Sequence, residues 1–424
     1  MSHQYPLSYY AAVAPKTKVR EPLKGDHTAD VVVVGGGYSG LAAALSLAER
    51  GYSVRLVEQA RVGWGASGRN GGQVTAGLAK GIATIDRLYG RQTTKQLWPL
   101  SREAVNLVAK RIKLGKIDCD MTTGVLAAAI SPSHLEDVKH EADELHKYFN
   151  EPDYQVWDRA QVQSAIQTER YIGGGYDPHS FHLNPLKFSL GLAQMAEAAG
   201  VIIHEESPVL RVVYGDRPQV VTDRGTVTAS FVVLATNAYG VGLVKELTGM
   251  LMPVASIIMA TEPLGELGKT VYPKPIAVAD CNFILDYFRP SPEGRLLFGG
   301  RAHYNGKEPA DIKAALTPRM LRVFPQLAGV KIDYSWGGLI GISRNRIPQL
   351  GRLTPNVYYA QAYSGQGIAL ANLLGTLVAE AIDGQASRYD VFARIKHSKF
   401  PGAGRMRSTI LTLAMLYYSV LDAR

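Results

Sequence analysis

The chain has 424 residues, 46% of them hydrophobic, which is enough apolar material for a large core in two or three domains. Its formal net charge is +9, but the basic residues are spread along the chain, so a nucleic-acid-binding surface is not expected. Its two cysteines, Cys119 and Cys281, form no Cys-x-x-Cys pair, which indicates no metal site and favours a reducing, cytoplasmic location.

The two ends of the chain lack the pattern of a membrane anchor. Residues 1–18 have no apolar core of a secretory signal, and the stretch TILTLAMLYYSV, residues 409–420, is too short to span a bilayer. We expect that stretch to belong to a C-terminal helical segment, residues 386–424, that docks on the core; contact with a membrane surface is the alternative. The sequence therefore predicts a protein without an integral membrane segment.

The first predicted elements are a strand, a glycine turn and a helix. The run DVVVV, residues 30–34, is typical of a parallel strand that is buried on both faces. Gly35, Gly37 and Gly40 follow with the spacing G-x-G-x-x-G. The first glycine permits the tight turn, the second lets a pyrophosphate approach the backbone, and the third lets helix and strand pack closely.

A helix that begins at Tyr38 and a second strand complete this unit. The first N–H groups of the helix point toward the expected position of the phosphate. The strand SVRLVE, residues 53–58, ends at Glu58, and an acid at this distance from the glycines accepts a hydrogen bond from a ribose hydroxyl. Residues 30–58 therefore predict a site for FAD or NAD rather than NADP, and close packing without a ligand is the alternative.

A glycine-rich loop, RVGWGASGRNGGQ, occupies residues 61–73 directly after this unit. Five glycines and the polar side chains of Ser67, Asn70 and Gln73 exclude a regular helix or strand. The backbone N–H groups of such a loop can lie along a pyrophosphate or along the edge of a flavin ring. An ordinary surface loop is the alternative.

Two later segments predict strands that end where they can meet the same ligand. Residues 221–240 predict a hairpin and a buried strand that ends at Thr236 and Asn237, small polar residues at the carboxyl edge of a parallel sheet. Residues 358–382 predict a strand, a glycine turn and a helix whose N-terminus can offer N–H donors to the pyrimidine edge of a flavin. For this second segment, packing alone is the alternative.

The segments between these motifs predict the remaining elements. Helices are expected in residues 80–150, one of them opened by Ser133, and another helix begins at Asn184. Strands with one helix are expected in residues 250–330.

These motifs resemble those of the family of FAD-dependent amine and D-amino-acid oxidases, which includes sarcosine oxidase and glycine oxidase. The matching segments cover nearly the whole chain and include DVVVVGGGYSGLAAALSLAERGYSVRLVE, RVGWGASGRNGGQV, FVVLATNAY and NVYYAQAYSGQGIA. The resemblance implies an α/β fold: a Rossmann-like FAD-binding domain, with the βαβ unit of glutathione reductase, interleaved with an α+β substrate domain built on an antiparallel sheet.

The resemblance also implies which residues contact the cofactor, FAD. They are Gly35, Gly37, Tyr38, Ser39, Gly40, Glu58, Ser67, Gly68, Asn70, Gly71, Gly72, Gln73, Val209, Thr236, Asn237, Tyr363, Ser364, Gly365, Gln366 and Gly367. Some members hold the flavin covalently through a cysteine in the segment that here reads GLIGISRNRIPQLG, and because this chain has no cysteine there, noncovalent FAD is expected. Members often have a histidine in place of Gln366, so no titratable group is expected at that position.

The flavin motifs are separated in the sequence, so the FAD-binding domain is expected to be discontinuous. It is expected to comprise residues 28–80, 155–250 and 330–385, while residues 81–154 and 251–329 form the substrate domain. Substrate is expected where the two domains meet.

The residues expected near the substrate have side chains that suit an amine with a carboxylate tail. Arginine binds carboxylates, and aromatic rings favour an ammonium group or its alkyl chain. The candidates are Tyr287, Arg289, Arg301, Tyr304, Trp336 and Arg344. No catalytic side chain is assigned, and His182 and His303 are left without a role.

The resemblance implies an enzyme that oxidises an amine C–N bond. The expected substrate is gamma-glutamylputrescine or a related polyamine, which yields an aldehyde and ammonia, with hydrogen peroxide if oxygen is the acceptor. The alternatives are an oxidase or dehydrogenase of glycine or D-amino acids, a flavin-containing RNA- or partner-binding protein, and a membrane-associated dehydrogenase. The expected partners are the small-molecule amine and an electron acceptor.

Overall fold

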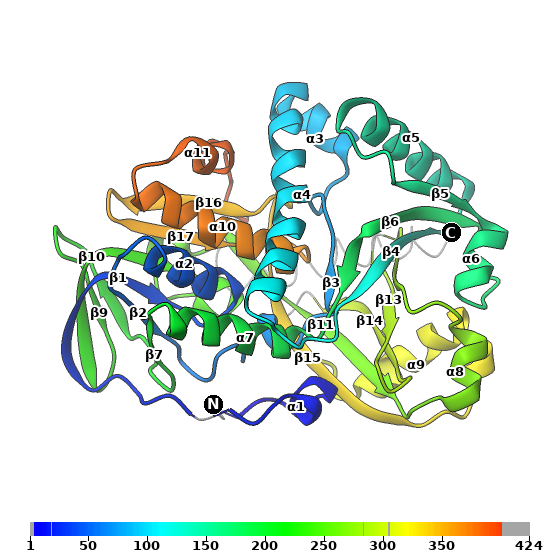
Figure 1. The fold of residues 1–424 in the computed structure, drawn as a ribbon, viewed down its shortest axis with the longest axis horizontal. Coiled ribbons are helices and arrows are strands. Elements are labelled where there is room, and N and C mark those ends of the chain that lie inside the picture. The colour runs from blue at the N-terminus through cyan, green and yellow to red at the C-terminus, as the bar shows by residue number, and fades with distance from the viewer. Residues whose placement is uncertain (1–3, 18, 283, 304–305, 401–424) are drawn as a thin grey trace.

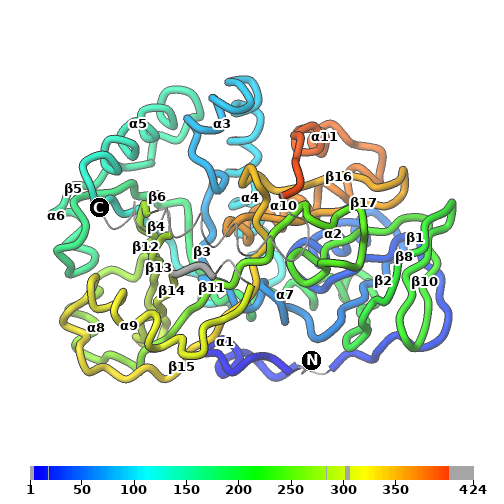
Figure 2. Tube along the Cα trace, turned by 180° about the vertical axis from the view of Figure 1, so that it is seen from behind, coloured from blue at the N-terminus to red at the C-terminus, as the bar shows by residue number. Residues whose placement is uncertain are grey.

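The computed structural model describes residues 4–400 except 18, 283 and 304–305, and without the side chains of 301–303. The apolar stretch 409–420 therefore lies outside the described residues. Two β-sheets organise the chain and stand at opposite ends of the molecule (Figures 1 and 2).

The first sheet has eight strands in the order β16-β17-β10-β1-β2-β7, with β9 on β10 and β8 on β9. From β17 to β7 the pairing is parallel, as the runs of β-branched residues predict. The strands are β1 (Gly25–Val34), β2 (Val54–Val57), β7 (Ile202–His204), β8 (Arg211–Val213), β9 (Gln219–Val221), β10 (Gly225–Leu234), β16 (Gln349–Thr354) and β17 (Val357–Gln361).

The carboxyl ends of β1 and β10 meet at one edge of this sheet. Val34 lies opposite Leu234 in the parallel register, so the turns after the two strands emerge side by side. Ligands of doubly wound sheets bind at this kind of edge. The predicted hairpin before β10 is confirmed, because β9 pairs with β10 in antiparallel fashion.

Three helices pack beside one another on the first sheet: α2 (Tyr38–Ala48), α7 (Pro185–Ala198) and α10 (Gly367–Ile382) (Figure 1). The predicted start of α7 is confirmed, since the Asn184 side chain accepts hydrogen bonds from two backbone N–H groups of its first turn. Helices α2 and α10 approach closely at Gly375, where a Cβ would lie 2.3 Å from the carbonyl oxygen of Ser39.

The second sheet has nine strands in the order β15-β11-β14-β13-β12-β4-β6-β3, with β5 on β6. Its pairs are antiparallel except β12 with β4, which agrees with the predicted antiparallel sheet. The strands are β3 (Gln73–Val74), β4 (Thr122–Ala129), β5 (Gln155–Asp158), β6 (Gly173–His182), β11 (Leu251–Thr261), β12 (Ala277–Asp280), β13 (Tyr287–Pro290), β14 (Leu296–His303) and β15 (Ile332–Ser343).

Four strands that the expected boundaries assign to the FAD-binding domain belong to the second sheet. Strand β3 lies in residues 28–80, β5 and β6 lie in residues 155–250, and β15 lies in residues 330–385, yet all four are part of the second sheet. The physical reason is pairing: β15 pairs with β11 over nearly its whole length, and β6 pairs with both β4 and β5. Apolar patterning identifies a strand but not its neighbours. The division of the chain into two domains stays a prediction.

Most of the remaining helices cover the second sheet and the space between the sheets, whereas α11 packs on β16 and α10, and α1 contacts α7. Helix α4 contacts α10 and α7 on one side and α3 on the other, and α3 contacts α5. Figures 1 and 2 both show α3, α4 and α5 grouped together. The helices are α1 (Tyr9–Val13), α3 (Ile82–Tyr89), α4 (Arg91–Leu114), α5 (Pro132–Tyr148), α6 (Arg159–Ala165), α8 (Gly265–Val271), α9 (Ile312–Val323) and α11 (Ser387–Ala393).

Helix α5 begins two residues earlier than predicted. Its N-cap is Ser131, whose side chain accepts a hydrogen bond from the backbone N–H of His134, and Pro132 occupies the first helical position. Proline suits that position because the first N–H of a helix has no partner within the helix. The expected cap Ser133 therefore lies inside the helix. Within the described residues, no helix is both long enough and apolar enough to cross a membrane.

Candidate active site

A cavity of about 990 Å³ extends from the carboxyl edge of the first sheet to the space between the second sheet and α3, α4 and α5. Its volume is near the upper end of the range for small-molecule sites, roughly 300–1,000 Å³. Two parts with different linings can be distinguished. We call the part lined by residues 34–39, 58–59, 64–67, 69–73, 209, 236–237 and 363–367 the glycine-lined half, and the part lined by residues 76–82, α4, α5 and the second sheet the helix-lined half.

Most of the predicted cofactor residues line the glycine-lined half. The exceptions are Gly40 and Gly68, each of which packs against another backbone segment. A Cβ on Gly40 would lie 1.9 Å from the carbonyl oxygen of Gly35, and one on Gly68 would lie 2.3 Å from that of Gly63. These two glycines therefore shape the turn and the loop from behind.

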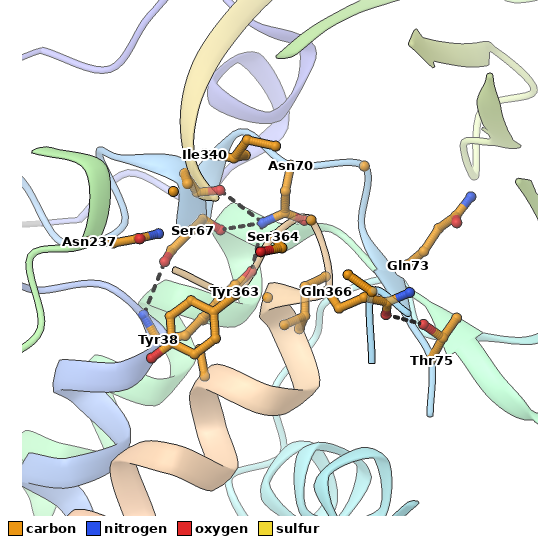
Figure 3. Close-up of a pocket in the computed structure, with 18 of the residues that line it drawn as sticks. Tyr38, Ser67, Asn70, Gln73, Thr75, Asn237, Ile340, Tyr363, Ser364 and Gln366 are labelled. Carbon is orange, nitrogen blue, oxygen red and sulfur yellow. Dashed lines mark hydrogen bonds between the residues drawn. The ribbon is translucent and has the colours of Figure 1, made fainter. Parts of the chain in front are cut away.

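The start of α2 faces the glycine-lined half without a side-chain cap. Its N-cap residue is Gly37, and the backbone N–H of Tyr38 donates to the Ser67 hydroxyl over 3.0 Å. The positive end of the helix dipole together with a glycine backbone suits an anionic group such as a phosphate. Ser67 belongs to the glycine-rich loop, so the loop and the helix bound the same space (Figure 3).

Glu58 fixes the turn after β1 from the neighbouring strand β2. One carboxylate oxygen accepts from the backbone N–H of Gly36 over 2.6 Å, and the other accepts from that of Ala60 over 2.9 Å. Burial raises the pKa of Glu58, and the backbone hydrogen bonds oppose that change. Glu58 also lines the cavity, as its predicted contact with a ribose requires.

The glycine-rich loop is ordered by its own polar groups. The Asn70 amide donates to the carbonyl oxygens of Ala66 and Ser67 over 2.9 and 3.1 Å, and its oxygen accepts from the backbone N–H of Gly72 over 2.9 Å. This loop is therefore held in one shape, unlike an ordinary surface loop. On the opposite wall, the Gln366 amide oxygen accepts from the Thr75 hydroxyl over 2.8 Å (Figure 3).

The turn before α10 is strained in a way that presents its backbone to the cavity. Ala362, Ser364 and Gly365 have φ of 62°, 55° and 99°, in the left-handed region. The Tyr363 hydroxyl lies 2.5 Å from that of Ser39, which joins this turn to α2. Burial raises the pKa of Tyr363, so its hydroxyl keeps its proton.

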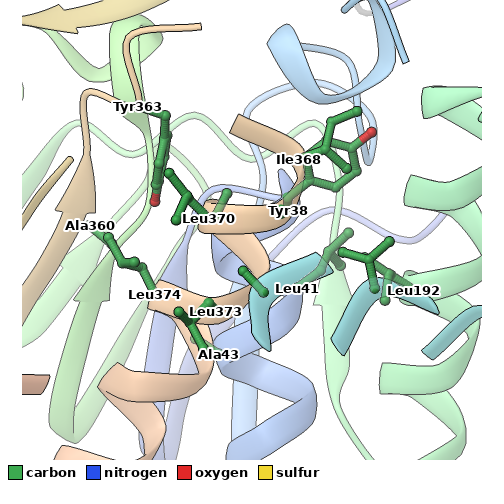
Figure 4. Close-up of a cluster of buried hydrophobic side chains, with 14 of the residues drawn as sticks. Tyr38, Leu41, Ala43, Leu192, Ala360, Tyr363, Ile368, Leu370, Leu373 and Leu374 are labelled. Atoms are coloured by element: carbon green, nitrogen blue, oxygen red, sulfur yellow. The ribbon is translucent and has the colours of Figure 1, made fainter. Parts of the chain in front are cut away.

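An apolar cluster between α2, α7 and α10 supports this wall of the cavity (Figure 4). Leu370, Leu373 and Leu374 of α10 are fully buried, as is Leu41 of α2. Full burial of each such side chain contributes roughly 1.5–3 kcal/mol to folding. The two helix N-termini are therefore held rigidly with respect to each other.

The expected substrate-side residues are not brought together. Tyr287 lines the cavity, and its hydroxyl lies 3.2 Å from that of Ser256. Arg344 is exposed and donates to the Ser398 hydroxyl over 3.2 Å, outside the cavity lining. The side chain of Arg301 and the whole of Tyr304 lie outside the described residues.

Arg289 and Trp336 are buried behind the glycine-rich loop rather than in the cavity lining. Arg289 donates to the carbonyl oxygens of Gly71 and Leu183 over 2.9 and 2.8 Å, and Trp336 donates to that of Arg69 over 3.0 Å. Their donors are thus used to hold the loop. The sequence could not predict this role, because the acceptors are backbone carbonyl oxygens, which every residue type has.

His182 is a structural residue of β6. Its Nε2 lies 2.8 Å from the carbonyl oxygen of Pro275, and it does not line the cavity. Burial, and then the positive charge of Arg289, lower the pKa of His182 to about 3. The ring is therefore neutral at physiological pH. The side chain of the other uncommitted histidine, His303, is not described.

The helix-lined half was not predicted from the sequence. Its polar side chains include Lys80, Trp98, Arg102, Glu141 and Tyr154. Burial, and then the positive charges of Arg346 and Arg87, lower the pKa of Lys80. The spacing of Trp98 and Arg102 by four positions on one helix face was a visible signal, but a core stripe has the same spacing.

Comparison with known proteins decides the family. The sequence pattern of the family described as "FAD dependent oxidoreductase" (DAO) matches residues 30–381. The chain belongs to this family of FAD-dependent oxidoreductases. It is 38% identical to the gamma-glutamylputrescine oxidoreductase of Escherichia coli (strain K12) over 421 residues, which cover 99% of both chains. It is also 38% identical to the probable oxidoreductase OrdL of Haemophilus influenzae over 407 residues, 95% of this chain and 94% of that one.

Solved structures show the same fold. Glycine oxidase from Geobacillus kaustophilus superimposes with a TM-score of 0.74 at 22% sequence identity, covering 88% of this chain and 100% of that one. An L-amino acid deaminase from Proteus myxofaciens superimposes with a TM-score of 0.71 at 17% identity, covering 90% of this chain and 95% of that one. The resemblance inferred from the motifs is thereby confirmed.

FAD is the cofactor of this family, and the residues of the glycine-lined half fit it. Gly36 and Gly37 leave room that a Cβ would fill, 3.1 Å from the Glu58 side chain and 2.8 Å from the Ser67 hydroxyl. Neither α2 nor α10 is capped by the side chain of its N-cap residue, and in α2 the N–H of Tyr38 is the one that donates to Ser67. These features suit the pyrophosphate and the ring of a dinucleotide.

Proposed function

We propose that this FAD-dependent oxidoreductase oxidises the primary amine of gamma-glutamylputrescine or a related polyamine conjugate. The amine R–CH2–NH2 loses two electrons and two protons to give an imine, and water hydrolyses the imine to R–CHO and ammonia. The observation that carries the proposal is 38% identity over the full length to an enzyme named for this substrate. The second half of the cavity provides the length that a conjugated amine needs beyond the cofactor.

The residues of the glycine-lined half hold the FAD in this proposal. Gly35, Gly37 and the start of α2 would hold the pyrophosphate, and Glu58 would accept from a ribose hydroxyl. The turn from Tyr363 to Gly367 and the start of α10 would hold the pyrimidine edge of the flavin. When bound, FAD accepts a hydride equivalent from the carbon next to the amine.

The chain itself positions the amine and limits water. Tyr287 stands at the border of the two halves, because a Cβ on Gly71 would lie 2.6 Å from its ring. Burial raises the pKa of Tyr287, so its hydroxyl stays protonated. A partly apolar cavity favours the neutral form of an amine, which is the form that can lose the hydride. The hydrogen bond from Thr75 fixes the orientation of the Gln366 amide, and this amide does not titrate.

The FAD is held without a covalent bond in this proposal. Neither described free cysteine, buried Cys119 or partly exposed Cys281, lines the cavity. Precipitation of the holoenzyme with trichloroacetic acid should leave the yellow colour in the supernatant. Colour that stays with the pellet contradicts noncovalent binding and leaves the amine reaction untouched.

Two other functions make different demands. An oxidase of glycine or D-amino acids needs room for a small substrate only, and the cavity extends well past the glycine-lined half. A flavin-containing RNA-binding protein needs clustered basic residues and strongly salt-dependent binding of RNA.

A turnover experiment in air tests the substrate and the acceptor together. The holoenzyme is incubated with gamma-glutamylputrescine, putrescine, glycine or D-alanine, while ammonia and hydrogen peroxide are measured. We expect ammonia from gamma-glutamylputrescine in preference to the other three, with equal peroxide if oxygen is the acceptor. If only glycine or D-alanine yields ammonia, the substrate is an amino acid and the proposed substrate is wrong.

A further inference from the structure

Four polar side chains gather in the helix-lined half, outside the residues that face FAD. Trp98 and Arg102 lie on α4, Glu141 lies on α5, and Tyr154 lies in the segment before β5. All four line the cavity. We call them the distal cluster.

The elements that carry the distal cluster pack directly together. Trp98 shares an apolar contact group with Leu145, one turn beyond Glu141 on α5, and Tyr154 packs against the same group. Residues four positions apart lie on one helix face, so Glu141 and Leu145 point the same way. Burial, and then the negative charges of Glu141 and Asp177, raise the pKa of Tyr154, as expected for groups that lie close together.

Two donors of the cluster are buried and have no partner within the described residues. They are Nε1 of Trp98, a residue that is only 9% exposed, and Nη1 of Arg102. The other donors of Arg102 are used: Nε donates to Glu151 and Nη2 to Asp177, each over 2.8 Å. Buried donors of native proteins nearly always have a partner, so these two call for an acceptor that the described residues do not supply, and both residues line the cavity.

Glu141 offers the opposite chemistry. No hydrogen bond or ion pair of the described residues involves its carboxylate. Burial, and then the charge of Asp137, raise its pKa, whereas His140 opposes that change. Because Arg102 already pairs with two other carboxylates, Glu151 and Asp177, the carboxylate of Glu141 remains available to a cation.

A ligand that satisfies both kinds of group carries an ammonium and a carboxylate on neighbouring atoms. We propose that the distal cluster binds the α-amino-acid end of the substrate: Glu141 accepts from the α-ammonium, while Trp98 and Arg102 donate to the α-carboxylate. This inference rests on the proposed oxidation of an amine at the flavin. The cluster then selects amines that end in an amino acid over unconjugated diamines such as putrescine.

The test separates the two charges of the substrate. Glu141→Gln keeps the shape of the side chain and removes its charge. We expect KM for gamma-glutamylputrescine to rise about 10- to 100-fold with little change in kcat, as for a lost hydrogen bond between charged groups. KM for N-glutarylputrescine, which lacks the α-ammonium, should change less than about twofold. An equal rise for both substrates, or no rise for either, overturns the inference.

A second variant tests the carboxylate. Trp98→Phe removes the Nε1 donor and keeps an aromatic ring. We expect it to raise KM for gamma-glutamylputrescine and to leave KM for N-(4-aminobutanoyl)putrescine, which has the ammonium but no carboxylate, nearly unchanged. A rise for both substrates overturns this half of the assignment. Glu136→Gln on the exposed face of α5 is the matched control, and the flavin spectrum checks that each variant folds.

The wild-type enzyme distinguishes failure of this inference from failure of the proposed function. If it oxidises putrescine, N-acetylputrescine and gamma-glutamylputrescine with equal kcat/KM, amine oxidation stands and the amino-acid subsite is wrong. If it oxidises none of these amines, the proposed function and the inference fail together.

Discussion

The glycine-lined half of the cavity is built mainly from backbone, whereas the helix-lined half is built from side chains. In the first, closely spaced glycines and two uncapped helix starts create the surface. In the second, groups on α4, α5 and the segment before β5 converge from about 60 residues of sequence, counted from Trp98 to Tyr154. In our proposal the cofactor that the family shares is therefore held mainly by backbone, while the substrate is bound by separate side chains.

The largest expected effect comes from breaking the backbone of the glycine-lined half. Gly40→Ala places a Cβ 1.9 Å from the carbonyl oxygen of Gly35, so the turn and α2 must separate. We expect a protein that is isolated without yellow colour or is not soluble. Gly81→Ala is the control, because a Cβ there meets nothing within 4 Å. A Gly40→Ala protein with full FAD content would contradict the account of this turn.

A smaller loss of FAD binding is expected when one acceptor oxygen of Glu58 is replaced. In Glu58→Gln, an amide NH2 faces the backbone N–H of either Gly36 or Ala60, so one buried donor loses its partner. The cost is about 1–3 kcal/mol, and we expect FAD affinity to fall about 10- to 100-fold in a titration followed by flavin fluorescence. The exposed Glu49→Gln serves as the control. Unchanged affinity for FAD in Glu58→Gln shows that this carboxylate does not shape the site.

A substitution of His182 tests whether this residue of the second sheet stabilises the fold or transfers a proton in the reaction. Its native pKa of about 3 lies below the ordinary value of 6.5. Between these values only the unfolded chain takes up a proton at this residue, so the stability that neutral His182 gives is lost as pH falls. The slope is about 1.4 kcal/mol per pH unit.

His182→Gln keeps an N–H donor toward Pro275 and should remove that part of the slope in urea unfolding measured at pH 7, 6 and 5. The pH profile of kcat should keep its shape. A loss of kcat by more than about 100-fold with an unchanged stability slope would instead make His182 catalytic.

The smallest effect on activity is expected from a substitution at the border of the two halves of the cavity. Thr75→Val removes the hydroxyl that donates to Gln366 and keeps the side-chain shape. A hydrogen bond of this kind contributes about 1 kcal/mol, so kcat/KM should fall about fivefold with FAD still bound. Loss of FAD from Thr75→Val would show that this contact supports the cofactor rather than the reaction geometry.

The fold and the residues of the glycine-lined half could be predicted because their sequence signals are local. The glycine spacing, the acid at the end of β2 and the N-cap Asn184 each act within a few residues of themselves. The substrate side could not be predicted in the same way. Arg289 and Trp336 turned out to support the loop, and Glu141 has the same sequence appearance as any acid on an amphipathic helix. Which side chains converge there depends on how distant segments pack.

Anaerobic mixing of the holoenzyme with gamma-glutamylputrescine tests the central claim most directly, because it reports electron transfer from the amine to the flavin. We expect rapid bleaching of the flavin absorbance, faster than with putrescine, glycine or D-alanine at the same concentration. Absorbance that stays unchanged with FAD bound would contradict the proposed oxidation of gamma-glutamylputrescine and, with it, the assignment of the helix-lined half to a gamma-glutamyl amine.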